Sequence, residues 1–96
     1  MGDLGRIKEE AAEILIGASQ GLLEGTLDDI EEVAEELAAD LVEAAAEGDE
    51  DLLQITVSRI RLMGERARIR ATDAAWEILQ NVAKAIFAIL KEALLP

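Results

Sequence analysis

The only proline of this 96-residue chain is its last residue, Pro96, so no proline interrupts a helix before that point. Residues 51–95 contain a single glycine, Gly64, and their apolar residues recur every three or four positions. This spacing places apolar side chains on one side of an α-helix, whereas a half-buried strand needs strict alternation. Alanine and leucine are the most abundant apolar residues, and aromatic residues make up only 2%. The sequence predicts an all-α protein that forms one domain over residues 1–96.

The first predicted helix spans about residues 3–23 and begins at Asp3, a residue type that caps helix N-termini. Its apolar positions, from Leu4 and Ile7 onward, follow a three-four spacing. Glycines at 17, 21 and 25 weaken its end, because each glycine costs about 1 kcal/mol relative to alanine inside a helix. Residues 17–25 therefore fit either the end of this helix or a loop.

The second predicted helix spans residues 27–47 and has clear signals at both ends. Thr26 precedes it as an N-cap, and acidic residues fill its first turns, where the helix dipole favours negative charge. Gly48 supplies the C-terminal stop, and Asp49 or Asp51 caps the helix that follows. These residues predict a tight helical hairpin.

For residues 50–94 we expect one long helix, about 66 Å in length. Its apolar stripe runs without a change of phase through Leu53, Val57, Ile60, Gly64, Ala67, Ala71, Ala75, Ile78, Val82, Ile86, Ile89 and Ala93. The alternative is a break near Thr72 and Asp73, either of which could cap a fourth helix and close a monomeric up-down four-helix bundle. The continuous helix is favoured because no glycine precedes that break as a C-terminal stop.

Charge is distributed unevenly over the chain, whose net charge is −12. Residues 1–51 hold 17 acidic and two basic residues, and residues 52–96 hold four acidic and seven basic ones. Folding the hairpin about its turn brings residue numbers that sum to about 97 face to face. The acids at 28, 29, 31, 32, 35 and 36 then lie across from Arg61, Arg66, Arg68 and Arg70. We expect these arginines to neutralise the acids rather than bind nucleic acid, since long-range repulsion opposes phosphate contacts.

The same hairpin register gives Gly64 a specific neighbour. It places Gly64 opposite Val33 and Ala34 of the second helix. Small residues here and at 67 and 71 would let the two backbones approach closely.

The chain lacks the residues that most catalytic and metal sites use. It has no cysteine and no histidine, which excludes thiol nucleophiles, imidazole acid–base chemistry and the usual zinc sites. The acidic run at 49–51 lacks the glycine and the spaced oxygen ligands of an EF-hand loop. We expect no catalytic residues, no metal site, no cofactor and no enzymatic activity.

The C-terminal part of the predicted long helix, from Ala74 onward, is apolar around most of its circumference. A helix of this kind is buried on several sides, and one hairpin cannot cover it. The sequence therefore predicts an oligomer. The candidate interaction residues are Trp76, Leu79, Val82, Ile86, Phe87, Ile89, Leu90 and Leu94. Charged residues and a short apolar run argue against a transmembrane helix.

Residues 27–95 resemble small acidic all-helical proteins of tailed bacteriophages and prophages. The resemblance rests on the order of an acidic helix, the Gly48-Asp49 turn, the arginines from Arg61 to Arg70, and Trp76 before an apolar tail. It implies a phage or virion component and assigns no role to individual residues.

These observations predict a non-enzymatic helical structural or assembly protein that self-associates through its C-terminal helix. Its partners would be copies of itself or other protein subunits, with no direct nucleic-acid binding. One alternative is an acidic, phage-type inhibitor that binds a basic surface of a host protein. A weaker one is a membrane-associated accessory protein that uses the last helix. The N-terminus lacks a basic, apolar signal peptide, so we expect a cytoplasmic location or one within a virion or other assembly.

Overall fold

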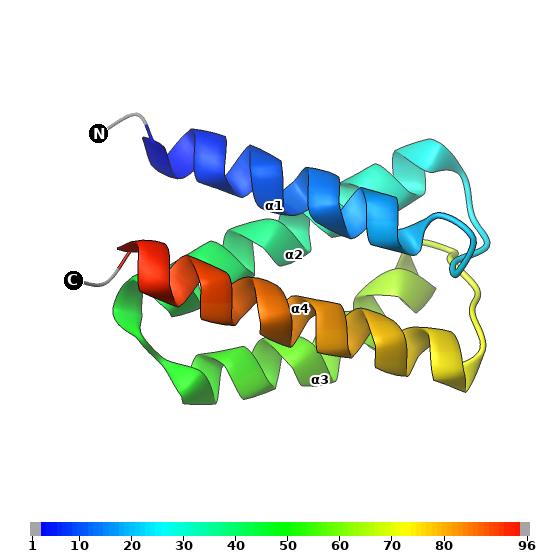
Figure 1. The fold of residues 1–96 in the computed structure, drawn as a ribbon. Helices are drawn as coiled ribbons and strands as arrows, with labels where there is room; N and C mark the ends of the chain where they lie inside the picture. The colour runs from blue at the N-terminus through cyan, green and yellow to red at the C-terminus, as the bar shows by residue number, and fades with distance from the viewer. Residues whose placement is uncertain (1–2, 95–96) are drawn as a thin grey trace.

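A computed structural model describes residues 3–94, with only the backbone of Asp3. It contains four α-helices: α1 (Asp3–Ser19), α2 (Leu27–Glu47), α3 (Glu50–Arg66) and α4 (Asp73–Leu94). Figure 1 shows them as an antiparallel bundle, with the α2–α3 turn at one end and the α1–α2 and α3–α4 loops at the other. Helices α2 and α4 contact each other and both remaining helices, whereas α1 and α3 do not touch within the described residues. The all-α prediction is confirmed.

Three predicted caps are present at the helix ends. The Asp29 amide donates a hydrogen bond to Thr26 Oγ1 (3.1 Å) at the start of α2, and the Leu52 amide donates to Asp49 Oδ1 (3.0 Å) at the start of α3. Gly48 ends α2 in the left-handed conformation, at φ 62°. Helix α1 ends at Ser19 rather than at residue 23, because Gly21 takes a φ of 82° that no α-helix contains.

The prediction of one continuous helix over residues 50–94 is wrong, and the chain instead breaks between Arg66 and Asp73. Arg68 adopts the left-handed conformation, at φ 64°. The Ile69 amide then donates to the Gly64 carbonyl (2.9 Å), and the Arg68 amide donates to the Glu65 carbonyl (3.1 Å). These two bonds form a Schellman motif, which normally places glycine where this chain has Arg68.

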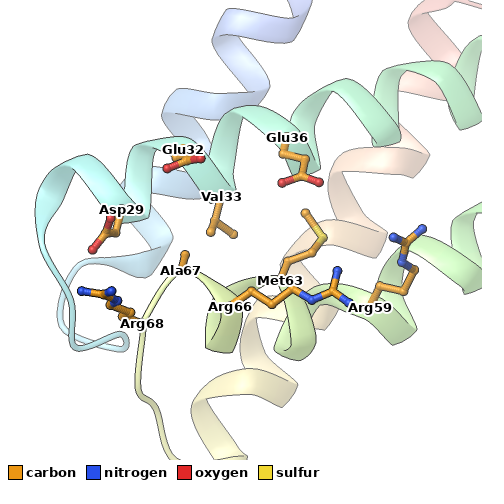
Figure 2. A pocket seen from close by; sticks show the side chains of 9 residues that line it. All are labelled: Asp29, Glu32, Val33, Glu36, Arg59, Met63, Arg66, Ala67 and Arg68. Atoms are coloured by element: carbon orange, nitrogen blue, oxygen red, sulfur yellow. The ribbon is translucent and has the colours of Figure 1, made fainter.

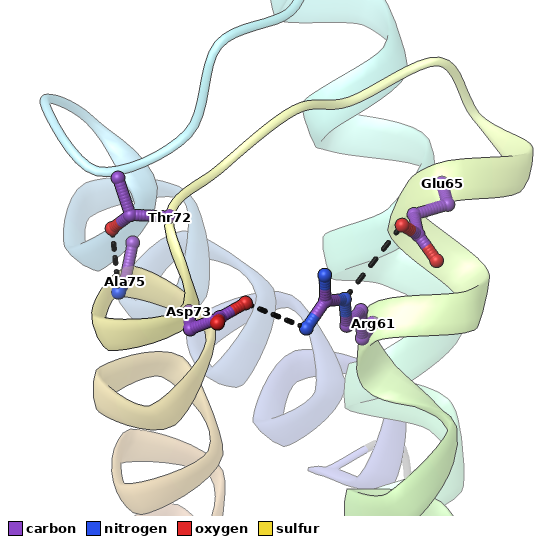
Figure 3. A network of polar contacts seen from close by, with 5 residues as sticks. All are labelled: Arg61, Glu65, Thr72, Asp73 and Ala75. Atoms are coloured by element: carbon purple, nitrogen blue, oxygen red, sulfur yellow. Dashed lines mark hydrogen bonds and ion pairs between the residues drawn. The ribbon is translucent and has the colours of Figure 1, made fainter.

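Helix α4 begins at the alternative cap, Thr72. The Ala75 amide donates to Thr72 Oγ1 (3.1 Å), and Arg61 Nη1 of α3 lies 2.8 Å from Asp73 Oδ1. Arg61 Nε also lies 3.6 Å from Glu65 Oε2, so one guanidinium joins the end of α3 to the start of α4 (Figure 3). These contacts are exposed to solvent, and pairs of this kind contribute about 0–1 kcal/mol each.

The two loops at one end of the bundle pair with each other. Glu24 and Arg70 exchange backbone hydrogen bonds of 2.7 and 2.8 Å. Beside them the Ile69 side chain is only 2% exposed, and a Cβ placed on Gly25 would lie 3.1 Å from it. The α3–α4 loop is thus anchored to the α1–α2 loop, which fixes where α4 begins.

The left-handed residue predicts a stabilising substitution. Arg68→Gly should raise the free energy of unfolding by about 1 kcal/mol, because glycine adopts positive φ without the steric cost that a Cβ brings. Arg66→Gly is the matched control, since it removes an equal charge from the last helical residue of α3. That control should destabilise the protein by about 0.5–1 kcal/mol. Equal effects of the two substitutions in urea unfolding would contradict the assigned loop conformation.

Candidate functional site

The eight candidate interaction residues of α4 do not lie on one surface. Five of them, Trp76, Leu79, Ile86, Phe87 and Leu90, are buried in the core of the single chain. Val82 and Leu94 are half-buried, and Ile89 is 64% exposed. The five core residues are therefore not available as an interface, because the other helices of the same chain already cover them.

Four of the apolar residues of α4 that remain exposed or half-buried form a strip along one side of the helix. Its members are Ile78, Val82, Ala85 and Ile89, which are four, three and four residues apart and so share one helix face. Ile78 is 46% exposed and Ile89 is 64% exposed. We call these four residues the α4 strip.

The α4 strip lies on the flank of α4 that faces away from α3. The opposite flank carries Trp76, whose ring packs over Gly64 of α3, and Lys91, whose Nζ lies 3.7 Å from Glu50 Oε1 of α3. At helical spacing the strip lies on the other side of α4 from Trp76 and Lys91. That is the side along which α1 runs beside α4 (Figure 1). Ile14 of α1 is also 53% exposed. The strip is thus left open beside α1.

Helix α4 carries less charge than the acidic helix α2. Its 22 residues include three acids and two lysines, Asp73, Glu77, Glu92, Lys84 and Lys91. The 21 residues of α2 include nine acids and no basic residue. The α4 strip is therefore a nearly neutral surface on a protein of net charge −12, where another protein could approach with little repulsion.

A cleft of about 380 Å³ separates acids of α2 from arginines of α3 and the following loop. Figure 2 shows the carboxylates on one wall and the guanidinium groups on the other. The charged lining residues are Asp29, Glu32, Glu36, Arg59, Arg66 and Arg68. The predicted facing of acids and arginines is confirmed for Arg66 and Arg68, but Arg61 points instead to α4 and Arg70 pairs through its backbone with Glu24.

The acids and arginines of this cleft face each other without direct pairing. Among residues 3–94, no α2 carboxylate oxygen lies within 4.0 Å of an arginine or lysine nitrogen. The cleft holds no histidine or cysteine and no enclosed chamber, and its charges are open to solvent. It places opposite charges on two facing helices.

Asp40 is the acid of α2 whose ionisation the fold disfavours. Burial raises the pKa of its carboxyl above 3.8, the Glu36 carboxylate one turn away raises it further, Arg59 lowers it, and Glu43 raises it. A raised native pKa means that the folded state binds more protons than the unfolded state just above pH 3.8. Stability conferred by this group therefore falls as pH rises through that window, and its ionised form weakens the fold at pH 7.

Asp40→Asn should accordingly raise the melting temperature at pH 7 and have little effect near pH 3. The control is Glu35→Gln, which removes one negative charge from the exposed face of the same helix. Thermal unfolding of both variants between pH 3 and pH 7 separates the local effect from overall charge. A gain for Glu35→Gln that matches that of Asp40→Asn would show that total charge, not burial of Asp40, sets the effect.

Within residues 3–94, no group of three or more acidic side chains is arranged to hold a metal ion. Over the same residues, none of the helices combines the length and the apolarity that crossing a bilayer requires.

No protein family, curated protein or solved structure matches the chain. The resemblance to phage proteins and the absence of enzymatic activity therefore stay predictions.

Sequence reasoning missed half of the α4 strip. The apolar spacing of the sequence places Ile78 in the buried stripe and gives no indication that Ala85 lies on a surface. The spacing of apolar residues within α4 could have located the strip. When α4 is treated as a separate helix, its core-facing residues are 76, 79, 83, 86, 87 and 90. Ile78 and Ile89 then lie outside the core.

Proposed function

We propose that the protein is a non-enzymatic helical assembly protein that self-associates through the α4 strip. The observation that supports this is the strip itself, an apolar row with the exposed Ile78 and Ile89 at its ends on a weakly charged helix. Exposed apolar patches that are continuous mark interaction surfaces more often than scattered apolar residues do. The resemblance of residues 27–95 to phage helical proteins favours a virion or phage assembly as its setting.

The size of the strip sets the expected affinity. Burying a fully exposed isoleucine contributes about 1.5–3 kcal/mol, and these isoleucines are already partly covered. Association costs about 4–15 kcal/mol in translational and rotational freedom. Four isoleucines, two from each copy, contribute about 3–7 kcal/mol once their existing burial is discounted, so the strip supports only weak association, with a Kd in the millimolar range or above. Such a protein would assemble at high local concentration.

The test is sedimentation equilibrium from 10 µM to 1 mM. The average mass should rise from 10.3 kDa toward twice that value. Ile78→Glu with Ile89→Glu should hold the protein at the monomer mass, because each carboxylate would lose its hydration at the interface. Ile55→Glu with Leu62→Glu is the matched control, since these α3 residues are 53% and 45% exposed and lie off the strip. A monomer mass throughout for the wild type, or equal loss in both double variants, would contradict the proposal.

The unpaired acids of α2 favour a second candidate function, an acidic inhibitor that binds a basic protein surface. An inhibitor of this kind needs acids that are exposed and free to pair with a partner. Among the described residues they form no ion pair with arginine or lysine, and several are exposed. A carboxylate-rich helix face can compete with an anionic ligand for a basic site.

Binding to an immobilised arginine-rich peptide distinguishes this candidate. Asp28→Asn, Glu32→Gln and Glu35→Gln together should weaken binding by α2 more than Glu9→Gln, Glu10→Gln and Glu13→Gln, which remove the same number of charges from α1. Equal weakening by the two triple variants would mean that net charge alone governs binding, and the inhibitor proposal would then fail.

A further inference from the structure

We infer that the α3–α4 loop is a hinge through which two copies of the chain exchange their α4 helices. In the exchanged dimer, α4 of each copy fills the place in the other bundle that α4 fills in the single chain. The surface that pairs is therefore the core face of α4, which the folded single chain covers, and not the exposed α4 strip. The inference goes beyond the proposed self-association and does not depend on it.

The hinge contains a residue in a conformation that its side chain disfavours. Arg68 has a φ of 64°, in the left-handed region, where a Cβ lies too close to the following carbonyl. The connection between α3 and α4 is short, residues 67–72 only. Short connections under strain favour exchange, because opening the loop releases the strain and a second copy restores the contacts that opening breaks.

The residues of the hinge favour a different conformation from the one they adopt. The segment 67–72 contains neither glycine nor proline, and two alanines and two arginines, which have high helix propensity, are among its members. Tertiary contacts hold it in the turned conformation, since Glu24 and Arg70 exchange backbone hydrogen bonds and the Ile69 side chain is buried. Once these contacts open, the local preference of the hinge is to straighten, which carries α4 away from its own bundle.

Exchange leaves the core of each bundle unchanged. The Trp76 ring over Gly64 and the approach of Lys91 to Glu50 both join α4 to α3, and in the dimer the same contacts form between the two copies. The two forms therefore differ mainly in the hinge and in the number of chains. A short linker holds α4 beside its own bundle at an effective concentration of the order of millimolar, so exchange competes only at comparable protein concentration.

Cross-linking between chains tests the exchange in the full-length protein, which has no natural cysteine. Glu50→Cys and Lys91→Cys are made in separate chains, at positions whose side chains meet in one bundle. The two proteins are unfolded together in urea and refolded at about 1 mM in salt that screens the repulsion between acidic chains. A bis-maleimide that spans two packed helices, whose axes are about 8–10 Å apart, should then join residue 50 of one chain to residue 91 of the other. A denaturing gel measures the yield of the joined pair.

Variants of the hinge decide whether exchange produces that pair. Arg68→Gly should lower the yield about tenfold more than Arg66→Gly, because both add a glycine to the straightened hinge but only the first removes strain from the single chain. Ile69→Ala should raise the yield several-fold, since it removes a buried contact that holds the turned conformation.

Two results would overturn the exchange. One is the absence of a joined pair after refolding together, and the other is an equal yield for Arg68→Gly and Arg66→Gly. The double change Ile78→Glu and Ile89→Glu should leave the yield unchanged, because the α4 strip lies outside the exchanged surface. Loss of the pair in that variant would also overturn the exchange, and it would support association of whole bundles through the strip instead.

Discussion

Replacing Trp76 with alanine should lower the free energy of unfolding by about 3–5 kcal/mol, the range for large aromatic side chains removed from a core. Trp76 is 3% exposed and packs its six-membered ring over Gly64 of α3. The loss is large against a typical domain stability of about 5–15 kcal/mol, so the variant should be partly unfolded well below the melting temperature of the wild type. Urea unfolding followed by circular dichroism measures this change.

The Trp76 variant also separates a core role from the interface role that the sequence suggested. If Trp76 formed an interface between copies, its loss would lower the oligomer mass and leave the monomer as stable as before. Leu62→Ala on α3 serves as the control, because that side chain is 45% exposed and should cost far less. A stable monomeric Trp76→Ala variant would contradict the four-helix core.

Gly64→Ala should be the next most damaging substitution, with a loss of about 1–3 kcal/mol from overpacking. A Cβ at this position would lie 2.3 Å from Trp76 Cη2 and 2.8 Å from Cζ3, so the indole ring would have to move. Inside a helix the same change normally stabilises by about 0.5–1 kcal/mol, because alanine restricts the unfolded chain. The sign of the effect therefore reports the close approach of α3 and α4.

Gly17→Ala is the matched control for Gly64→Ala, since Gly17 also lies within a helix and a Cβ there would meet nothing within 4 Å. It should stabilise the protein by about 0.5–1 kcal/mol. Trp76→Leu should also reduce the cost of Gly64→Ala, because residues in contact couple non-additively. Additive effects of the two substitutions, or a stabilising Gly64→Ala, would show that the ring does not lie over residue 64.

Local sequence signals predicted most helix ends because each end depends on nearby residues. The side chains of Thr26 and Asp49 each accept a hydrogen bond from the backbone amide three residues later. Gly48 takes the positive φ that glycine favours. Thr72 has the same capping chemistry and marked the alternative break that the structure contains. These caps need no knowledge of the tertiary fold.

The sequence does not reveal the break between α3 and α4, because an arginine occupies the position where a glycine usually ends a helix. Arg68 takes the left-handed conformation, and the pairing of Glu24 with Arg70 and the burial of Ile69 hold the loop in place. These contacts join segments that lie far apart in the sequence, which a periodic pattern cannot encode. The sequence also places Gly64 opposite Val33 and Ala34, but it does not predict that a Cβ at this position would meet the Trp76 ring of α4.

The position of the candidate site also depends on the tertiary fold and could be predicted only in part. Composition indicated that α4 is more apolar than one hairpin can cover, and the structure covers most of that surface with the other helices of the same chain. The loop at 67–72 interrupts the helix, so the apolar spacing of α4 does not continue that of α3. Within α4 alone, Ile78 and Ile89 lie on a different face from the neighbouring core residues. The proposed interface could not be located on the last helix without the spacing within α4, and self-association through that helix stays a prediction.

The most direct test is the distance within one chain between the start of α3 and the end of α4. Asp51→Cys and Glu92→Cys, both exposed positions, accept a donor and an acceptor dye, and excess unlabelled protein removes transfer between chains. The folded-back hairpin, in which Lys91 Nζ lies 3.7 Å from Glu50 Oε1, predicts high transfer efficiency from closely spaced dyes. A continuous helix would separate the two positions by about 60 Å and give low transfer. That result would contradict the four-helix bundle and the α4 strip that depends on it.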